Sequence, residues 1–256
     1  MAKKSIDQVI CGDCLEIMPT LEDKSIDMVL ADLPYGTTNL KWDSLIPLEP
    51  LWREISRVTK DDSALVFTAS QPFTTTLISS NIEQFRYEWI WNRNSNAGFL
   101  TVNYRPMKIH ENVMVFSKSL ASFNKHRGAM RYYPVLRKGT PFRRSATTGR
   151  GHSKLAKFGG AKPVNTDLIN TGTRYPISII EFKNDNHNRY HVTQKPVALF
   201  EYLIRTYTHE GDTVLDPTAG SGTTAVACKR SNRHYICIEK EPEYCAIAEK
   251  RIAEML

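Results

Sequence analysis

The sequence predicts an α/β fold with a mostly parallel sheet, because short apolar segments alternate with amphipathic helical segments along its 256 residues. The runs Gln8–Cys11, Ile26–Ala31 and Ala64–Phe67 have the length and composition of buried strands, and the first two are followed directly by Gly-Asp and Asp. The chain is long enough to bury one sizeable core, or one core with a small appended subdomain.

Helical and further strand patterns follow in the first half of the chain. Pro50–Lys60 carries apolar residues at helical spacing, and a second helix is expected around Pro72–Ser80. Tyr87–Asn92 and Asn112–Ser117 are rich in aromatic and β-branched residues, which favour strands. These segments therefore add both strands and helices to the same sheet.

Regular patterning resumes at Pro196, after a long irregular segment. Apolar side chains then recur at helical spacing through Tyr207, and Gly211 provides a stop signal. The remaining elements are expected in the order strand, helix, strand and helix, at Thr213–Leu215, Thr223–Arg230, Tyr235–Ile238 and from Pro242 onward.

The irregular segment, residues 119–188, is rich in Gly, Pro, Thr and Arg, and we interpret it as a loop-rich insert with one strand at Ile177–Phe182. Its part from Ser119 to Thr166 holds eleven basic residues and no Asp or Glu, which leaves −4 on the rest of a chain whose net charge is +7. Such a basic insert with interleaved aromatic residues favours binding to nucleic-acid phosphates over a merely solubilising loop. The candidate DNA-binding residues are Arg131, Arg137, Lys138, Arg143, Arg144 and Arg150.

Several classes of protein are disfavoured. No apolar run approaches the roughly 20 residues that cross a membrane, and Ser5–Gln8 stands where a signal peptide needs an apolar region. We therefore expect a cytoplasmic protein without membrane contact. The five cysteines include only one C-x-x-C pair, Cys11 and Cys14, and the seven histidines form no close liganding pair, so no metal site is expected.

The first motif with chemical meaning runs from Val214 to Thr224, where an apolar strand enters a glycine-rich turn that opens a helix. Glycines allow close backbone approach to a ligand, and Glu239, at the end of the next strand, suits a pair of ribose hydroxyls. These features predict a nucleoside cofactor at the carboxyl ends of parallel strands. The turn also fits the dinucleotide G-x-G-x-x-A pattern, but only 17 residues follow Glu239, too few for a second nucleotide-binding half.

The second motif, Asp32-Leu33-Pro34-Tyr35, ends an apolar strand. An exocyclic amine is a poor nucleophile because its lone pair is delocalised into the base. Two acceptors aimed at its hydrogens, the Asp32 carboxylate and the Leu33 carbonyl, would free that lone pair. Tyr35 would stack on a base swung out of the duplex, which this chemistry requires because a paired amine is inaccessible.

Together the two motifs resemble those of amino-methylating DNA methyltransferases. Asp32–Tyr35 resembles their Asp-Pro-Pro-Tyr catalytic motif, and Asp216–Thr224 their cofactor motif. His191–Pro196 resembles the segment before the cofactor motif in the β class, whose motif order this chain shares. The resemblance covers Gln8–Lys118 and His191–Ile252. It implies a circularly permuted, Rossmann-like S-adenosylmethionine-dependent fold with a seven-stranded sheet, divided into a catalytic part (1–118), a target-recognition insert (119–188) and a cofactor-binding part (189–256).

The resemblance also implies a role for each matching residue. Asp32, Leu33, Pro34 and Tyr35 would form the amine site. Thr193 and Lys195 would lie near the carboxylate of the cofactor, Asp13 near its adenine, and Glu239 at its ribose. The methionine half would be lined by Asp216, Gly220, Ser221, Gly222 and Thr223.

The leading Asp32 is typical of adenine-N6 members, whereas cytosine-N4 members usually begin with Ser. The resemblance thus implies sequence-specific N6-methylation of adenine in double-stranded DNA, with a homodimer and a cognate restriction endonuclease as further partners. Leu33 departs from the usual Pro, but a residue that acts through its carbonyl does not need the proline ring. The open alternatives are a cytosine-N4 or RNA methyltransferase, a nicotinamide oxidoreductase, and a non-catalytic DNA-binding protein on the same scaffold.

Overall fold

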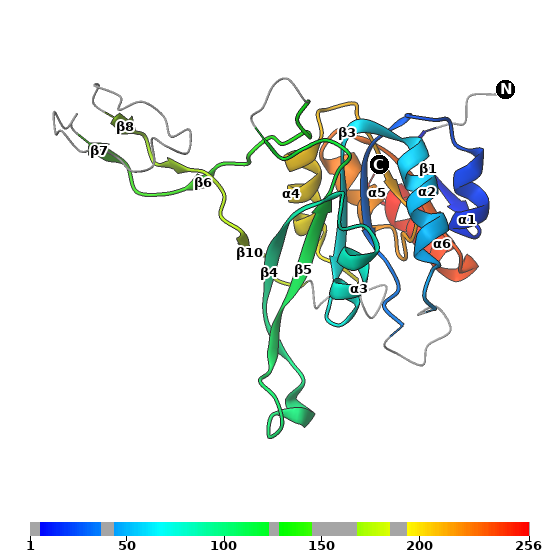
Figure 1. The fold of residues 1–256 in the computed structure, drawn as a ribbon, viewed down its shortest axis with the longest axis horizontal. Helices are drawn as coiled ribbons and strands as arrows, with labels where there is room; N and C mark the ends of the chain where they lie inside the picture. The colour runs from blue at the N-terminus through cyan, green and yellow to red at the C-terminus, as the bar shows by residue number, and fades with distance from the viewer. Residues whose placement is uncertain (1–5, 37–43, 123–127, 145–167, 185–193, 256) are drawn as a thin grey trace. The chain divides into compact units, whose positions relative to one another are not determined.

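The computed structural model describes residues 6–36, 44–122, 128–144, 168–184 and 194–255 (Figure 1). The chain forms two compact units. Met1–Tyr133 and Ile177–Leu256 make up the larger unit, and Pro134–Pro176 make up the smaller one. The smaller unit lies inside the basic segment that we interpreted as an insert, while the flanks of that segment belong to the larger unit.

The larger unit is built around an eight-stranded sheet with the order β1-β12-β11-β2-β3-β5-β4-β10. Only the pairs that involve β5 are antiparallel, so the predicted α/β class with a mostly parallel sheet is confirmed. The sheet has one strand more than the seven expected, because β10 adds to its edge beside β4. The strands are β1 (Gln8–Cys11), β2 (Ile26–Asp32), β3 (Thr59–Ala69), β4 (Phe85–Ala97), β5 (Lys108–Phe116), β10 (Ile179–Glu181), β11 (Thr213–Asp216) and β12 (His234–Glu239).

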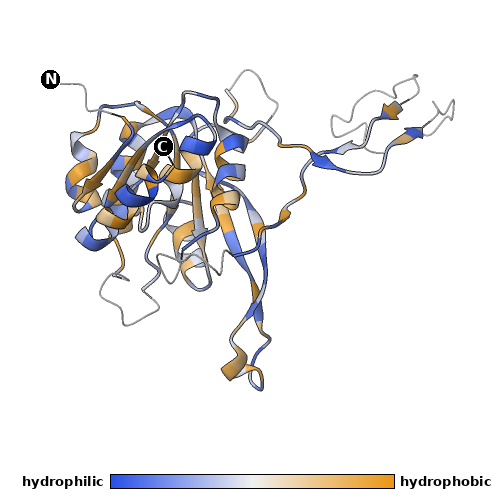
Figure 2. Ribbon diagram, turned by 180° about the vertical axis from the view of Figure 1, so that it is seen from behind, coloured by the Kyte–Doolittle hydropathy of each residue, from blue (hydrophilic) through white to orange (hydrophobic). Residues whose placement is uncertain are grey.

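Helices pack on both faces of this sheet, as parallel strands require. The side chains of α1, α2 and α3 join one buried apolar cluster, and those of α4 and α5 join a second cluster on the opposite face. Figure 2 shows hydrophobic residues concentrated along the central strands. The helices are α1 (Cys14–Ile17), α2 (Leu48–Val58), α3 (Phe73–Ser80), α4 (Val197–Tyr207), α5 (Thr223–Arg230) and α6 (Pro242–Ala253), with short 3-10 helices η1 (Met18–Thr20) and η2 (Phe99–Thr101).

Strand β2 shows why the apolar run Ile26–Ala31 becomes a central strand. Its successive side chains point to opposite faces, so Met28 and Leu30 enter one cluster while Val29 and Ala31 enter the other. All four side chains are fully buried. A strand covered on both faces must be apolar at every position, which explains the continuous rather than alternating pattern.

Strands β2 and β11 come from opposite ends of the chain but lie side by side. They are parallel, with Val214 opposite Met28 and Leu215 opposite Val29. Both strands therefore end at the same edge of the sheet. This pairing brings the Asp32–Tyr35 motif next to the glycine-rich turn that follows Asp216.

The smaller unit contains two short antiparallel pairs. Strand β6 (Arg137–Lys138) pairs with β9 (Thr173–Arg174), and β7 (Phe142–Arg144) pairs with β8 (Leu168–Asn170). The guanidinium of Arg174 lies 4.8 Å from the centroid of the Phe142 ring. These local pairs are the regular structure found within the described part of the smaller unit.

Candidate active site

The Asp32 carboxylate ends β2 and is held by hydrogen bonds from three side chains. Its Oδ1 accepts bonds from the Tyr35 hydroxyl at 2.6 Å and the Thr68 hydroxyl at 2.5 Å. Its Oδ2 accepts a bond from Lys195 Nζ at 2.7 Å. Burial, followed by the nearby carboxylates of Asp32 and Glu111, raises the pKa of Tyr35 well above its usual value. Tyr35 is therefore a neutral hydrogen-bond donor at physiological pH.

A chain of alternating charges continues from Asp32 into the base of the β4–β5 hairpin. Lys195 Nζ lies 3.4 Å from Glu111 Oε2, and Glu111 Oε1 lies 3.1 Å from the Arg93 guanidinium. Lys195 and Glu111 are each only 8% exposed. Burial by itself lowers the pKa of Lys195, but the two carboxylates outweigh it and raise that pKa, so Lys195 stays charged.

Lys195, expected near the carboxylate of the cofactor, contacts the Asp32 carboxylate and also lines the cavity. Thr68, Glu111 and Arg93 were not anticipated from the sequence. The available signal was Glu111 itself, because an acid two positions before the apolar run Val113–Phe116 needs a partner when buried. Thr68 carried no such signal, because a threonine is an ordinary strand residue.

The Tyr35 ring is fixed by packing as well as by its hydroxyl. It stacks on Phe73, with ring centroids 5.4 Å apart and planes 26° apart. Lys195 Nζ lies 5.7 Å from the centroid of the Tyr35 ring. Leu33 is 2% exposed, and its side chain joins the apolar cluster under α2 and α3. The side chain at the unusual position of the motif thus contributes to the core.

The glycine-rich turn after β11 contains two residues in the left-handed backbone region. Gly220 and Gly222 both have positive φ, at 52° and 80°. A Cβ at Gly222 would lie 2.7 Å from the Ala248 Cβ and 3.1 Å from the Ala248 Cα, whereas a Cβ at Gly220 would meet nothing within 4 Å. Gly222 therefore allows α5 to pack closely on α6, and Gly220 leaves space at the turn.

Two carboxylates organise this turn. Glu239 accepts the Gly220 amide at 2.7 Å on Oε2 and the Glu241 amide at 2.8 Å on Oε1. Asp216 accepts the Thr218 amide at 3.0 Å and the Thr224 hydroxyl. Burial raises the pKa of Asp216 to about 7. Asp216 thus stabilises the turn through two hydrogen bonds made by its buried carboxyl group.

The other expected cofactor residues converge on the same edge. Asp13 caps α1 by accepting the Leu15 amide at 2.9 Å, and its other oxygen lies 3.5 Å from Lys240 Nζ. The Ser221 hydroxyl lies 3.2 Å from Gln194 Oε1, so the segment before α4 reaches the turn. Thr193 lies outside the described residues.

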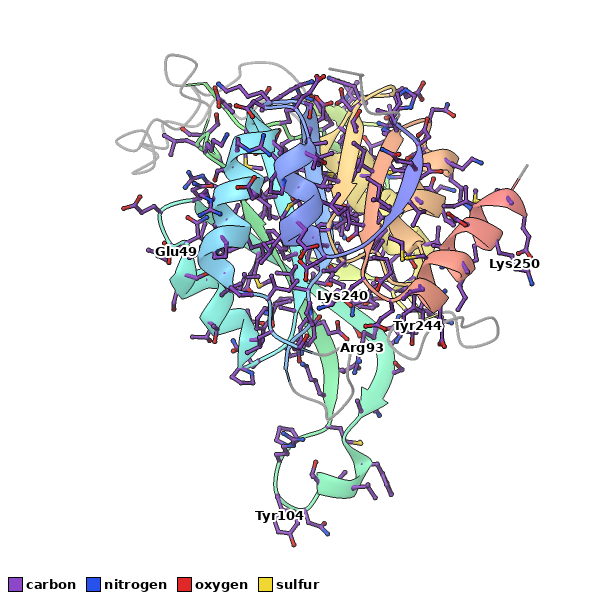
Figure 3. The ribbon with its side chains drawn as sticks, turned by 90° about the vertical axis from the view of Figure 1, so that its right-hand side faces the viewer. Glu49, Arg93, Tyr104, Lys240, Tyr244 and Lys250 are labelled. Carbon is purple, nitrogen blue, oxygen red and sulfur yellow. The ribbon has the colours of Figure 1, made fainter. Side chains whose placement is uncertain are left out.

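One cavity of about 490 Å³ is lined by residues of both motifs. Figure 3 shows the labelled side chains of Arg93, Lys240 and Tyr244 at this edge of the sheet, and all three line the cavity. Gly222 is absent from the lining, in keeping with its packing against α6. The expected site residues that line the cavity are Asp13, Asp32, Leu33, Pro34, Tyr35, Lys195, Asp216, Gly220, Ser221, Thr223 and Glu239.

The basic residues proposed for DNA divide into two groups. Arg131 forms ion pairs with Asp27 at 2.8 Å, Asp62 at 2.9 Å and Asp212 at 3.0 Å, and its side chain is 17% exposed. These three ion pairs anchor Arg131 within the larger unit. The sequence could not reveal this, because all three acids are far away along the chain.

The second group lies in the smaller unit. Arg137 and Lys138 in β6 and Arg143 in β7 are exposed. For Arg144 only the backbone, in β7, is described, and Arg150 lies outside the described residues. No group of three or more His, Cys, Asp or Glu in the described segments is arranged to hold a metal ion. Among the same residues, no helix is long and apolar enough to span a membrane.

A mostly parallel sheet, a glycine-rich turn of the nucleoside-binding type and a half-buried Asp32–Tyr35 pair in one cavity are typical of an α/β enzyme with a nucleoside cofactor. Residues 26–250 match the N6/N4 family described as DNA methylase. The chain belongs to this DNA methylase family.

Relatives and solved structures agree with this assignment. The Type II methyltransferase M.HpaI of Haemophilus parainfluenzae is 28% identical over 262 residues, which cover 96% of this chain and 74% of that protein. The structure of the PvuII DNA methyltransferase, which is cytosine-N4-specific, has a TM-score of 0.66 at 18% identity and covers 96% of this chain and 90% of that one. The M1.HpyAVI–SAM complex has a TM-score of 0.61 at 21% identity, with 95% and 98% of the two chains covered. Both structures share the fold of this chain.

Proposed function

We propose that this DNA methylase transfers the methyl group of S-adenosylmethionine to the exocyclic amine of a base in DNA, and that the base is adenine, methylated at N6. The observation that carries the proposal is the cavity shared by Asp32–Tyr35 and the glycine-rich turn. Amine activation and cofactor binding need one common space, because the amine nitrogen must approach the methyl carbon in line with the departing sulfur.

The cavity fits the cofactor in size and in chemistry. Its volume of about 490 Å³ falls within the range of small-molecule sites, roughly 300 to 1,000 Å³. Each oxygen of Glu239 accepts one backbone amide and keeps a second lone pair for a ribose hydroxyl. When bound, S-adenosylmethionine supplies an electrophilic methyl group on a positively charged sulfur. Asp13, at the same edge, is our candidate for its adenine.

The residues around Asp32 then orient the target amine. A carboxylate has about four acceptor positions, and Asp32 uses three of them on Tyr35, Thr68 and Lys195. The fourth is left for a hydrogen of the amine, while the Leu33 carbonyl accepts the other hydrogen. The nitrogen lone pair is thereby directed away from the base ring. The amine's proton leaves to solvent after methylation.

Tyr35 positions the base. Its ring is held by Phe73 and its hydroxyl by Asp32, so it presents a fixed aromatic surface for stacking at little entropic cost. A base inside a duplex does not reach this buried ring, and the proposed reaction therefore includes extrusion of the base from the stack. The exposed cations of the smaller unit are proposed to hold the DNA phosphates during this step.

The experiment that tests the base is nucleoside mass spectrometry of unmethylated genomic and plasmid DNA after incubation with isotopically labelled S-adenosylmethionine. We expect labelled N6-methyladenine. Labelled N4-methylcytosine would show that the target base is cytosine instead of adenine, and the proposed amine chemistry would stand. A parallel incubation with RNA is included, and label in RNA alone would exclude DNA as the substrate. Parallel digestion of the product with methylation-sensitive endonucleases maps the sequence around the modified base, because methylated sites resist cleavage.

A further inference from the structure

The tip of the β4–β5 hairpin is an exposed apolar surface that neither motif uses. Strands β4 and β5 pair with each other beyond the apolar clusters, out to Ala97 opposite Lys108. Figure 1 shows the hairpin projecting from the sheet, and Figure 3 shows Tyr104 pointing outward at its end. The tip, Gly98–Met107, folds on itself through short-range backbone bonds around η2.

The tip concentrates apolar side chains in solvent. Leu100 is 95% exposed, Tyr104 is 89% exposed and Phe99 is 77% exposed. Figure 2 shows hydrophobic colouring at this end of the hairpin. Contiguous exposed apolar side chains on a soluble domain mark an interaction site. A surface this exposed contributes little to the stability of the fold, so its composition points to a partner.

Charge and position identify the partner. From Ala97 to Lys108 the sequence holds two cations, Arg105 and Lys108, and no acid. Apolar and aromatic side chains next to cations suit a duplex, whose backbone is anionic and whose base steps offer apolar faces. A two-stranded ribbon also fits the major groove. A ten-residue tip is too small to be a stable dimer interface, which takes roughly 20 to 30 residues on each side.

The base of the β4–β5 hairpin forms part of the wall of the active-site cavity. Trp91 and Arg93 in β4 and Glu111 in β5 line that cavity. Lys108, which follows the tip, is three positions before Glu111, or roughly 10 Å along a strand. DNA that delivers a base to the cavity therefore lies within reach of the tip.

We propose that Gly98–Met107 is a DNA-contact element that inserts Phe99, Leu100 and Tyr104 against the base stack beside the extruded base, with Arg105 on the phosphates. This inference rests on the proposed function. In this proposal the side chains of the hairpin tip fill the space that the target base leaves in the duplex.

Photocrosslinking tests the contact without requiring methyl transfer. Tyr104→p-benzoylphenylalanine is irradiated with end-labelled, unmethylated plasmid fragments, and Ile82→p-benzoylphenylalanine is the control, because Ile82 is 61% exposed outside the hairpin. We expect a DNA adduct at position 104 and none at position 82. Crosslinking of position 104 to a second chain, or no DNA adduct at all, overturns the proposal.

A kinetic comparison tests insertion into the stack. The triple variant F99S/L100S/Y104S should methylate intact duplex plasmid at least about tenfold more slowly than the unaltered chain, with a smaller loss on the same DNA after heat denaturation. I82S should behave as the unaltered chain. An equal loss on both forms of DNA contradicts insertion. If the unaltered chain methylates no DNA, the proposed function fails, and crosslinking still decides whether the tip contacts DNA.

Discussion

At the scale of single residues, the active site is a row of opposite charges: Arg93, Glu111, Lys195 and Asp32. Each buried charge in such a row depends on its neighbours, because an unpaired buried charge is costly. Lys195 separates two carboxylates that would otherwise face each other. In the proposed reaction Lys195 acts through Asp32, which makes it a positioning residue.

Lys195→Met should lower kcat by at least about tenfold, equivalent to roughly 1.4 kcal/mol, because Asp32 and Glu111 then repel each other. Cofactor affinity, measured by calorimetry, should change little. Adding Glu111→Gln to this variant should restore part of the lost kcat, since it removes the repulsion. Lys250→Met, at an exposed site on α6, is the control. A kcat that stays low in the double variant contradicts the charge argument.

The raised pKa of Asp216 predicts that the stability of the fold depends on pH. Its carboxyl has a pKa of about 7 in the folded chain because it is buried, against an ordinary value of about 3.9. Between these values the folded state holds a proton that the unfolded state has released. The free energy of unfolding should therefore fall as pH rises through this window.

Asp216→Asn removes the titrating group and keeps an acceptor for the Thr218 amide. In urea unfolding without cofactor between pH 5 and pH 8, this variant should show a flatter pH dependence than the unaltered chain. Glu249→Gln, on the exposed side of α6, should leave the slope unchanged. An identical slope in D216N and the unaltered chain contradicts the assignment.

At the scale of elements, the positions of most strands and helices followed from apolar patterning, whereas their lengths did not. The helices at Val197–Tyr207 and Thr223–Arg230 lie where helical spacing predicted them. Strands β4 and β5 run several residues past their predicted ends at Asn92 and Asn112. Their outer parts pair only with each other beyond the core, so they carry polar residues and no burial pattern.

The sequence likewise predicted only part of the candidate site. Asp32, Gly220 and Glu239 could be identified from the sequence, because each belongs to a local motif at the end of a strand. Thr68 lies opposite Asp32 only because β2 pairs with β3. Glu111, on β5, contacts Lys195 from a distant segment, and Arg131 contacts its three acids only in the folded chain. Such contacts between distant segments leave no spacing in the sequence to detect.

The turn between β11 and α5 offers a matched pair of glycine variants. Gly220→Ala should cost about 1 to 3 kcal/mol of unfolding free energy, because alanine is strained at positive φ. Gly222→Ala should cost clearly more, since its Cβ also overlaps Ala248. Chemical denaturation measures both. Equal losses in the two variants would show that the approach of α5 to α6 is not set by Gly222.

At the scale of the whole molecule, the acid-free segment gives the smaller unit a strong positive charge on a nearly neutral scaffold. Its exposed cations Arg137, Lys138 and Arg143 should contribute to DNA affinity in a salt-dependent way. Replacing all three by Gln should reduce the slope of log K against log salt by about 0.9 for each phosphate that these side chains neutralise. Fluorescence anisotropy with duplex DNA measures this slope. Replacing Arg53, Arg230 and Lys250 by Gln, at exposed sites on the larger unit, should leave it unchanged.

The central claim is that one cavity holds two separable sites, the Asp32–Tyr35 motif for the amine and the turn with Glu239 for the cofactor. Asp32→Ala tests it most directly, because Glu111 remains to neutralise Lys195 and the fold should survive. Methyl transfer to DNA from labelled S-adenosylmethionine should fall by at least about a hundredfold, while calorimetry should give a cofactor Kd within about threefold of the unaltered chain. Methyl transfer that persists, or cofactor binding that disappears together with it, would contradict the account.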